Sequence, residues 1–310
     1  MQEIAIELDK LVRNIEKVIV GKTESVKLLV VGLVTNGHIL IEDVPGVGKT
    51  TLALALAKSV EGDFKRIQFT PDLLPSDVIG GSIYNQKNSE FEFKKGPVFT
   101  NILMADEINR TTPRTQSALL ESMQEYKVTA DGLSYPLPLP FMVVATQNPL
   151  EYQGTYPLPE AQIDRFLMKI NLGYMVEDEE KKVLIQQKET HPINALSSVL
   201  NLERVKQLQE AARQVEISEK ILDYIIRIIS ATRNMKEIRL GASPRASIAL
   251  MQACRVWALM EGRGYVIPDD VIKLSLWTLR HRLALAPHAK AAGRTQEELI
   301  NEIIKKTPVA

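Results

Sequence analysis

Short apolar segments alternate with helical patterns along roughly the first 175 residues of the chain. Five of these segments are nearly continuous in apolar residues, namely His38–Glu42, Lys65–Phe69, Ile102–Asp106, Phe141–Thr146 and Leu167–Ile170. Such runs are typical of strands in a parallel sheet that is covered on both faces. The pattern therefore predicts an α/β fold, with a five-stranded parallel sheet and helices on both of its faces.

Beyond about residue 175 the strand-like segments stop and only helical periodicity remains. Apolar residues recur at helical spacing over Ile221–Ile229, Ser243-Pro244 supplies an N-cap and first helical residue, and Pro268 opens a further helix. We therefore predict two domains, an α/β core over residues 1–175 and an all-α domain over residues 176–310.

Two hairpins are predicted to interrupt the core, at about residues 80–96 and about residues 127–140. In the second, Asp131-Gly132 lies between short alternating flanks, which is the strongest local signal for a two-residue turn. In the first, Phe91 and Phe93 alternate with glutamates. The sequence alone is equally consistent with plain surface ribbons at both places.

Composition changes the picture mainly by exclusion. Lys+Arg and Asp+Glu both number 38, so the chain lacks the basic excess that is typical of dedicated nucleic-acid binders. The single cysteine, Cys254, rules out an internal disulfide framework and fits a reducing compartment. The longest apolar run, Leu28–Val34, is far shorter than the roughly 18 residues of a membrane span. The N-terminal segment is acidic and does not resemble a signal peptide. We therefore expect a cytoplasmic protein without a membrane span.

The segment HILIEDVPGVGKT, from His38 to Thr50, indicates a phosphate-binding loop. The usual spacing G-x-x-x-x-G-K-[ST] would place glycine where this chain has Asp43. Backbone N–H groups, a lysine and a hydroxyl at the start of a helix are nevertheless all present, and Pro45-Gly46 can form the tight turn. The alternative is a glycine-rich turn with a solvated lysine. We expect seven residues to bind the phosphates: Pro45, Gly46, Val47, Gly48, Lys49, Thr50 and Thr51.

A pair of carboxylates ends the third predicted strand. Asp106 and Glu107 follow the apolar run of NILMADEINR, and so belong at the carboxyl edge of the sheet, where open α/β folds bind ligands. Asp106 is suited to the coordination shell of Mg²⁺, and Glu107 is suited to polarise the attacking water of a phosphoryl transfer. Taken alone, the pair could also be an acidic turn at a strand end.

With these motifs in hand, the chain resembles the MoxR family of AAA+ ATPases. The segments VIVGKTESVKLLVVGLVTNGHILIEDVPGVGKT, DEINRTTPRTQSALLESMQE, ATQNPLEYQGTYPLPEAQIDRF and GASPRAS occur in the order of the family and span most of residues 18–250. The resemblance implies an AAA+ core with a C-terminal helical lid, and ATP and Mg²⁺ as cofactors. The phosphate loop of the family often lacks its first glycine, so Asp43 looks like a family feature.

The resemblance also implies roles for individual residues around the nucleotide. Lys49 would bind the phosphates and Thr50 would hold Mg²⁺, with Asp106 and Glu107 as their acidic partners: Asp106 at the metal, and Glu107 as the catalytic carboxylate. Asn148 looks like the sensor that orients water against the γ-phosphate, although it could be a turn residue before Pro149.

Val20 and Gly21, ahead of the core, resemble the segment that lines the adenine. An ordinary helix-ending glycine is the alternative for this pair.

The resemblance implies that two arginines contact the nucleotide during hydrolysis. Arg165 looks like the arginine finger that a neighbouring subunit inserts, with a surface pair to Asp164 as the alternative. Arg245 resembles the second sensor, which reads the nucleotide from the lid of the same subunit. Its alternative is an exposed first-turn arginine, which the helix dipole disfavours.

The resemblance implies an ATP hydrolase that forms a homo-oligomeric ring, expected to be hexameric, and remodels or matures protein clients. MoxR relatives commonly act with a von Willebrand factor A domain protein; this chain has no D-x-S-x-S motif, so such a partner would be separate. Two alternatives are a nucleic-acid motor, which the neutral charge disfavours, and a nucleotide-gated switch with little turnover.

Overall fold

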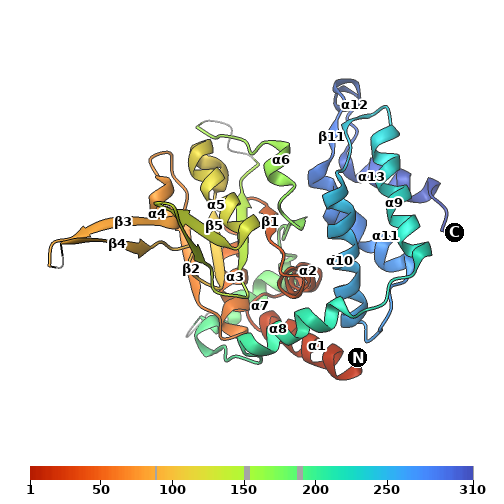
Figure 1. Cartoon of the computed structure of the whole chain (residues 1–310). Coiled ribbons are helices and arrows are strands. Elements are labelled where there is room, and N and C mark those ends of the chain that lie inside the picture. The colour runs from red at the N-terminus through yellow and green to blue at the C-terminus, as the bar shows by residue number, and fades with distance from the viewer. Residues whose placement is uncertain (88, 150–153, 187–190, 310) are drawn as a thin grey trace.

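A computed structural model describes residues 1–310 with the exception of 88, 150–153, 187–190 and 310. Figure 1 shows a sheet-containing core beside a group of helices that ends the chain, with a long hairpin projecting from the far side of the core. Among the described residues, no helix combines the length and the apolar character that a bilayer crossing requires.

The centre of the core is a five-stranded parallel sheet with the strand order β2-β5-β8-β1-β9. Its strands are β1 (Ile39–Glu42), β2 (Phe64–Gln68), β5 (Ile102–Asp106), β8 (Met142–Gln147) and β9 (Met168–Ile170). Each agrees with a predicted strand to within one residue at either end. The α/β prediction is confirmed, and the strand order places the carboxyl end of β1 between those of β8 and β9.

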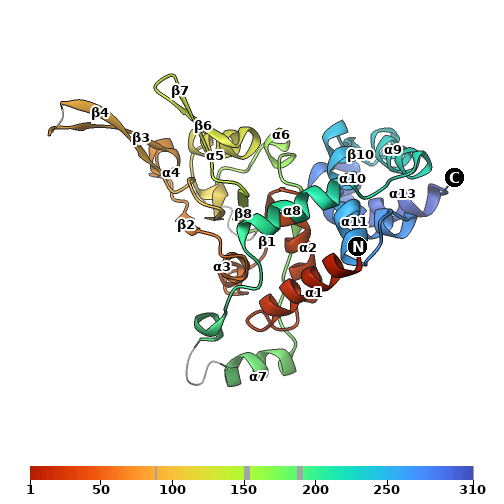
Figure 2. The same ribbon diagram turned by 60° about the horizontal axis from the view of Figure 1, so that its bottom comes forward.

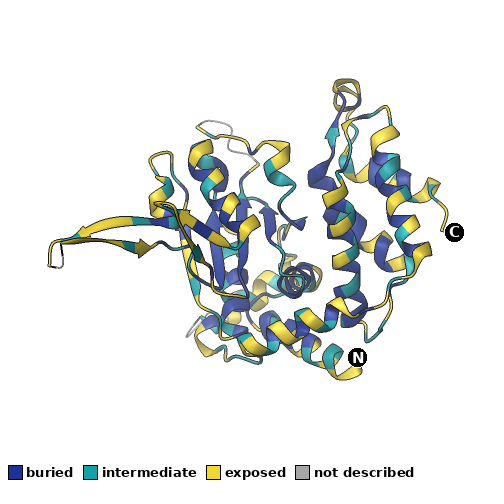
Figure 3. Cartoon of the chain, viewed as in Figure 1, coloured by how far each residue is buried: buried dark blue, intermediate teal, exposed yellow. Residues whose placement is uncertain are grey.

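Successive residues of the strands pack into two different cores, one on each face of the sheet. On β1, Ile39 and Ile41 belong to one apolar cluster and Leu40 to the other. The first cluster extends into helices of the chain's second half, whereas the second lies under α5 (Pro113–Glu125). Burial on both faces explains why β1, β5 and β8 are apolar along most of their length rather than alternating, as their dark blue colour in Figure 3 shows, whereas the edge strand β2 exposes Lys65, Arg66 and Gln68.

The helices on the first face come from both ends of the sequence. The core contributes α1 (Gln2–Glu16), α2 (Thr23–Val34) and α3 (Lys49–Ser59), which pack against one another and against later helices. Two further helices, α4 (Pro75–Ile79) and α6 (Glu160–Ile163), are short. Because the same apolar cluster runs through α1, α2 and the later helices, the division near residue 175 remains a prediction.

Both predicted hairpins are present. The first pairs β3 (Gly80–Asn85) with β4 (Glu90–Lys95), although residue 88 in its turn lies outside the described residues. The second pairs β6 (Lys127–Ala130) with β7 (Leu133–Pro136) around Asp131-Gly132, both of which have positive φ as a two-residue turn of this kind requires. Figure 2 shows the two hairpins projecting from the same side of the core.

The second half of the chain is helical, as predicted, with one addition. Its helices are α7 (Glu177–Gln186), α8 (Leu202–Arg213), α9 (Glu219–Asn234), α10 (Pro244–Met260), α11 (Pro268–Leu279), α12 (Pro287–Ala291) and α13 (Gln296–Lys306). The addition is a two-stranded antiparallel ribbon of β10 (Ile238–Leu240) and β11 (Ala284–Leu285). Strands this short leave no periodic signal in a sequence, because two or three residues cannot establish alternation. Three 3₁₀ turns complete the described chain: η1 (Ile108–Arg110), η2 (Pro192–Ala195) and η3 (Arg280–Arg282).

Candidate nucleotide-binding site

The phosphate loop connects β1 to α3. Gly46 and Gly48 have φ of 86° and 90°, a left-handed conformation that glycine adopts without strain, and helix α3 begins at Lys49 directly after Gly48. The first helical N–H groups therefore point toward the loop, as an anion site requires. Pro45 lies in the tight turn with Gly46, and Thr50 and Thr51 lie in the first turn of α3.

Lys49 folds back onto the loop. Its Nζ donates to the carbonyl oxygens of Asp43 at 2.7 Å and Val44 at 3.2 Å. Burial lowers the pKa of Lys49, and the charges of Asp43, Asp106 and Glu107 act in the opposite direction. The Lys49 ammonium therefore lies near three carboxylates but is bonded only to the uncharged carbonyls of Asp43 and Val44. A phosphate would compete well with these carbonyls for the ammonium.

The register of the sheet brings the other predicted residues to the same edge. Glu42 at the end of β1 pairs with Gln147, the residue before Asn148, and Gln68 at the end of β2 pairs with Asp106. Parallel strands end on one side, so the loop, the two carboxylates and the buried Asn148 converge there.

Thr146 fixes both carboxylates from the neighbouring strand. Its hydroxyl donates to Oδ1 of Asp106 at 2.6 Å and accepts a hydrogen bond from the backbone N–H of Glu107 at 2.8 Å. Arg66 donates from Nη2 to Oδ2 of Asp106 at 2.7 Å, which neutralises this nearly buried carboxylate. The Asp106 carboxylate is therefore held in place by the Thr146 hydroxyl and the Arg66 guanidinium.

Glu107 adopts a left-handed backbone conformation, with φ of 56°. A non-glycine residue there is uncommon and costs free energy, so the surrounding contacts must impose it. Its Oε2 accepts hydrogen bonds from Gln68 at 2.7 Å and from Arg110 at 2.9 Å. These contacts hold the Glu107 carboxylate beside Gln68, the last residue of β2.

A cavity of about 180 Å³ adjoins the loop. Three segments surround it: the turn after α1, the phosphate loop, and the segment after β9. Its lining residues are Val18, Ile19, Val20, Lys22, Gly46, Val47, Gly48, Thr51, Met175, Val183 and His191. The mostly apolar walls suit a flat heteroaromatic base.

Gly21 lies between two residues that line the cavity, Val20 and Lys22. Its φ is 75°, and a Cβ on it would come within 2.0 Å of the Glu179 side chain of α7, so that only glycine fits without a shift. Lys22 next to it donates from Nζ to the carbonyl of Tyr174 at 2.8 Å. The structure therefore places Val20 in the lining of the cavity beside the loop, whereas Gly21 is not among the lining residues and its role at the base stays a prediction.

The residues present suit Mg²⁺ bound together with a phosphate ligand. Among the described residues, no group of three or more His, Cys, Asp or Glu side chains could hold a metal by itself. Mg²⁺ is ordinarily held by one or two protein oxygens and by substrate phosphates. Thr50 and Asp106 offer a hydroxyl and a carboxylate of this kind.

Comparison with known proteins assigns the family. Residues 38–168 match the model "ATPase family associated with various cellular activities (AAA)", and residues 230–303 match the AAA lid domain. Chaperone MoxR1 of Mycobacterium tuberculosis is 44% identical over 96% of this chain and 81% of its own length. The chain belongs to the MoxR family of AAA+ ATPases.

Two further similarities extend along nearly the whole chain. The Bacillus subtilis protein YeaC, named as uncharacterized, is 53% identical over 97% of this chain and 95% of its own. A crystal structure described as a "putative ATPase" from Cytophaga hutchinsonii superposes with a TM-score of 0.92 at 41% identity, and covers 100% of this chain and 96% of the other.

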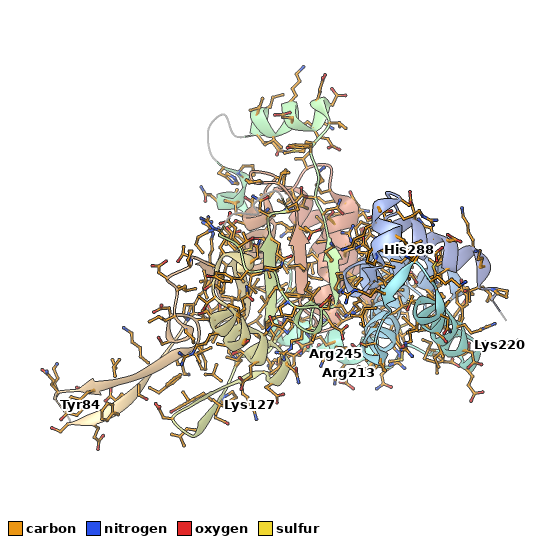
Figure 4. The ribbon with its side chains drawn as sticks, turned by 90° about the horizontal axis from the view of Figure 1, so that it is seen from above. Tyr84, Lys127, Arg213, Lys220, Arg245 and His288 are labelled. Atoms are coloured by element: carbon orange, nitrogen blue, oxygen red, sulfur yellow. The ribbon has the colours of Figure 1, made fainter. Side chains whose placement is uncertain are left out.

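The structure does not bring Arg245 to the phosphate loop of its own chain, contrary to the prediction. Arg245 lines a cavity of about 360 Å³ together with Arg165 and with His38, which precedes β1. The loop follows the other end of β1, a strand about 13 Å long at about 3.3 Å per residue. In Figure 4, Arg245 and Arg213 lie at one end of the molecule. Helix α7 lies at the other end, beside the cavity of about 180 Å³ that adjoins the phosphate loop, which we call the base-side cavity.

The physical reason is the way in which the lid docks. Asp164, next to Arg165, accepts hydrogen bonds from Arg282 at 2.6 Å and from the hydroxyl of Ser243, the N-cap of α10, at 2.8 Å. These bonds hold the first turn of α10 at the amino edge of the sheet. Among the described residues, the ion pair that Asp164 makes is with Arg282 of the lid, and not the Asp164–Arg165 pair that the sequence offered as the alternative.

Sequence patterns did not indicate several residues of this MoxR site. Arg66 and Thr146 meet Asp106 only through the pairing of separate strands, and His191, Met175 and Val183 reach the base-side cavity only through the path of the chain after β9. Arg110 alone had a local signal, because it lies three residues after Glu107 at helical spacing.

Proposed function

We propose that this protein is a Mg²⁺-dependent ATP hydrolase whose subunits join head to tail in a hexameric ring and act as a chaperone-like remodelling factor. The observation that carries the proposal is the separation of Arg165 and Arg245 from the phosphate loop of their own chain. Two cations lie at the amino edge of the sheet, and the nucleotide residues lie at its carboxyl edge. A second copy is needed to bring them together.

Head-to-tail contact follows from that separation. A surface on one end of a subunit that meets a different surface on the next subunit generates rings when the rotation closes. Among the residues that the structure describes, Nε of Arg165 is buried without a hydrogen-bond partner. Burial and the nearby Arg245 lower the pKa of Arg165, while the charges of Glu121 and Glu125 act in the opposite direction. An anion at the interface would relieve both conditions. The triphosphate bound to the next subunit is that anion.

The chain's own residues would divide the hydrolysis of ATP to ADP and phosphate as follows. Lys49 leaves the carbonyls of Asp43 and Val44 and binds the outer phosphates. Glu107 polarises the water that attacks the γ-phosphate, and Asn148 orients that water. Bound Mg²⁺, held by Thr50 and Asp106, would neutralise charge on the phosphates.

A mixing experiment tests the shared site. Lys49→Ala lacks the phosphate lysine, and Arg165→Ala lacks the finger, so each variant alone should hydrolyse ATP very slowly. Mixed before assembly, they should regain activity, because some neighbours then pair an intact loop with an intact arginine. Arg245→Ala mixed with Lys49→Ala should behave in the same way. If neither mixture gains activity although mixed rings form, the arginines do not act between subunits.

Assembly is tested by the native mass of Glu107→Gln with and without Mg²⁺-ATP. This variant should bind nucleotide without hydrolysing it, and so should accumulate the ring. A hexamer that needs ATP would support the proposal. A monomer under both conditions would contradict it and favour a nucleotide-gated switch.

The remodelling role draws on the relative named as a chaperone. Trapped Glu107→Gln rings should retain protein clients and a separate von Willebrand factor A domain protein in pull-downs, whereas Lys49→Ala should retain neither. Recovery of nucleic acid in place of protein, with hydrolysis stimulated by DNA and lost with salt, would indicate a motor instead.

A further inference from the structure

Asp43 stands where the usual phosphate loop has glycine, and its carboxylate is fully engaged. Oδ2 accepts hydrogen bonds from the backbone N–H groups of Leu172 and Gly173, both at 2.6 Å, and Oδ1 accepts one from Val44 at 2.9 Å. The residue is only 8% exposed. A carboxylate that accepts three backbone N–H bonds while buried forms strong, directional contacts.

The partners of Asp43 begin the segment that forms one wall of the base-side cavity. Gly173 is two residues before Met175, which lines that cavity, and Tyr174 between them accepts the hydrogen bond from Lys22. The phosphate loop and the base-side wall are thus joined at Asp43. A glycine at position 43 would have no side chain with which to make this connection.

We propose that Asp43 is a positioning residue that locks the phosphate loop to the base-side wall, so that the base and the phosphates of one nucleotide are bound in a fixed relative position. The inference rests on the proposed function, because it assigns Asp43 to the same nucleotide site. Asp43 touches neither part of the nucleotide in this role. It acts through Gly173 and the chain that leads to Met175.

Pre-organisation of this kind contributes to affinity only when both ends of the ligand are bound. A ligand with phosphates but no base uses the loop alone and gains nothing from the connection. The test therefore compares Mg²⁺-ATP with inorganic tripolyphosphate and Mg²⁺, both measured as dissociation constants in the Glu107→Gln background.

Asp43→Gly restores the usual G-x-x-x-x-G-K-T spacing, yet it should weaken ATP binding by about tenfold, since pre-organisation is lost. Tripolyphosphate binding should change by less than about threefold, as the loop keeps its N–H groups and Lys49. Asp43→Asn retains an acceptor oxygen for Leu172 and Gly173 and should recover most of the ATP affinity. Circular dichroism and the melting temperature establish that each variant is folded.

Glu42→Gln is the matched control. Glu42 precedes Asp43 and contacts the same part of the chain, but through a salt bridge of 2.7 Å to the Lys169 side chain and not through the backbone after β9. Its ratio of ATP to tripolyphosphate affinity should equal that of the parent.

Three results would overturn the inference: equal loss of both ligands in Asp43→Gly, no loss of either, or an Asp43→Asn variant that loses tripolyphosphate binding. The last would mean that the charge of Asp43 acts on Lys49. Failure of the parent to bind either ligand would instead contradict the proposed function itself.

Discussion

Nε of Arg282 in the lid donates a 2.6 Å hydrogen bond to Oδ1 of Asp164 in the core. The side chain of Arg282 is 2% exposed, and its other nitrogens bond to backbone carbonyls, including those of Leu167 and Phe166. Asp164 is thereby bonded to the lid, and the carboxylates whose charges act on the adjacent Arg165 are those of Glu121 and Glu125. The ion pair between Asp164 and Arg282 therefore docks the lid and does not include Arg165, the proposed arginine finger.

Asp164→Ala should lower the free energy of unfolding by about 3–5 kcal/mol, because it leaves the buried Arg282 charge uncompensated. Chemical denaturation monitored by circular dichroism measures the change. The control is Glu160→Gln, which breaks an ion pair to Arg239 whose side chains are 59% and 54% exposed. It should cost at most about 1 kcal/mol. If the two variants lowered the free energy of unfolding equally, burial of the Asp164–Arg282 pair would not explain its contribution to stability.

Arg165→Ala should reduce the ATP turnover number of assembled protein by about 10³–10⁵-fold, the range known for arginine fingers. Its nucleotide affinity should change little, since the residue lies far from the loop of its own chain. Steady-state hydrolysis and nucleotide titration separate the two quantities. Arg213→Ala removes another arginine from the same cavity, whose side chain bonds to Glu210, and should retain most of the activity. A comparable loss there would point to general loss of positive charge.

Glu107→Gln should lower the turnover number by about 10²–10⁴-fold, as expected when a general base is removed. Glutamine can still accept hydrogen bonds from Gln68 and Arg110, so ATP binding should persist. The test is to measure both the turnover number and the dissociation constant for ATP in this variant. A variant that hydrolyses ATP at the parental rate would exclude Glu107 from the chemistry.

Acid should destabilise the protein through His38. This buried imidazole lies between Met123 O and Val143 N–H, and burial lowers its pKa to about 4. The unfolded chain binds the proton below about pH 6.5, so between these values the unfolded state holds more protons and stability falls as pH falls.

The slope of unfolding free energy against pH should accordingly decrease in His38→Asn, by up to about 1.4 kcal/mol per pH unit between pH 6.5 and 4. Denaturation midpoints across that range give the slope. His281, whose pKa burial also lowers, remains in the variant and contributes in the same direction. An unchanged slope would mean that His38 does not titrate as a buried group.

The two hairpins should behave as one unit. The rings of Phe93 and Tyr135 stack at a centroid distance of 4.1 Å, and Ser82 bonds to Asp131 across the same gap. Tyr135→Ala removes a stack worth about 0.5–1.5 kcal/mol and should speed hydrogen exchange in both hairpins.

Phe91→Ala is the control, because Phe91 is 74% exposed and contacts Tyr84 within the first hairpin alone. It should leave exchange in the second hairpin unchanged. If Tyr135→Ala altered hydrogen exchange in the second hairpin alone, the two hairpins would move separately.

Sequence patterns located most of the elements because each has a local cause. The five strands follow from runs of apolar residues, the second hairpin from Asp131-Gly132, and helix α10 from the cap at Ser243-Pro244. The ribbon of β10 and β11 had no such signal, since its strands are two and three residues long.

The sequence by itself determined the chemical inventory: a glycine-rich loop with Lys49, two carboxylates after a strand, and the family to which their order belongs. Spacing along the chain is enough for these, because the loop and its helix are contiguous. Only the tertiary structure decided where Arg245 lies and what Asp43 contacts. Both depend on contacts between segments more than a hundred residues apart, such as Asp164 with Arg282 and Asp43 with Gly173, and no local pattern encodes which distant backbone a side chain will meet.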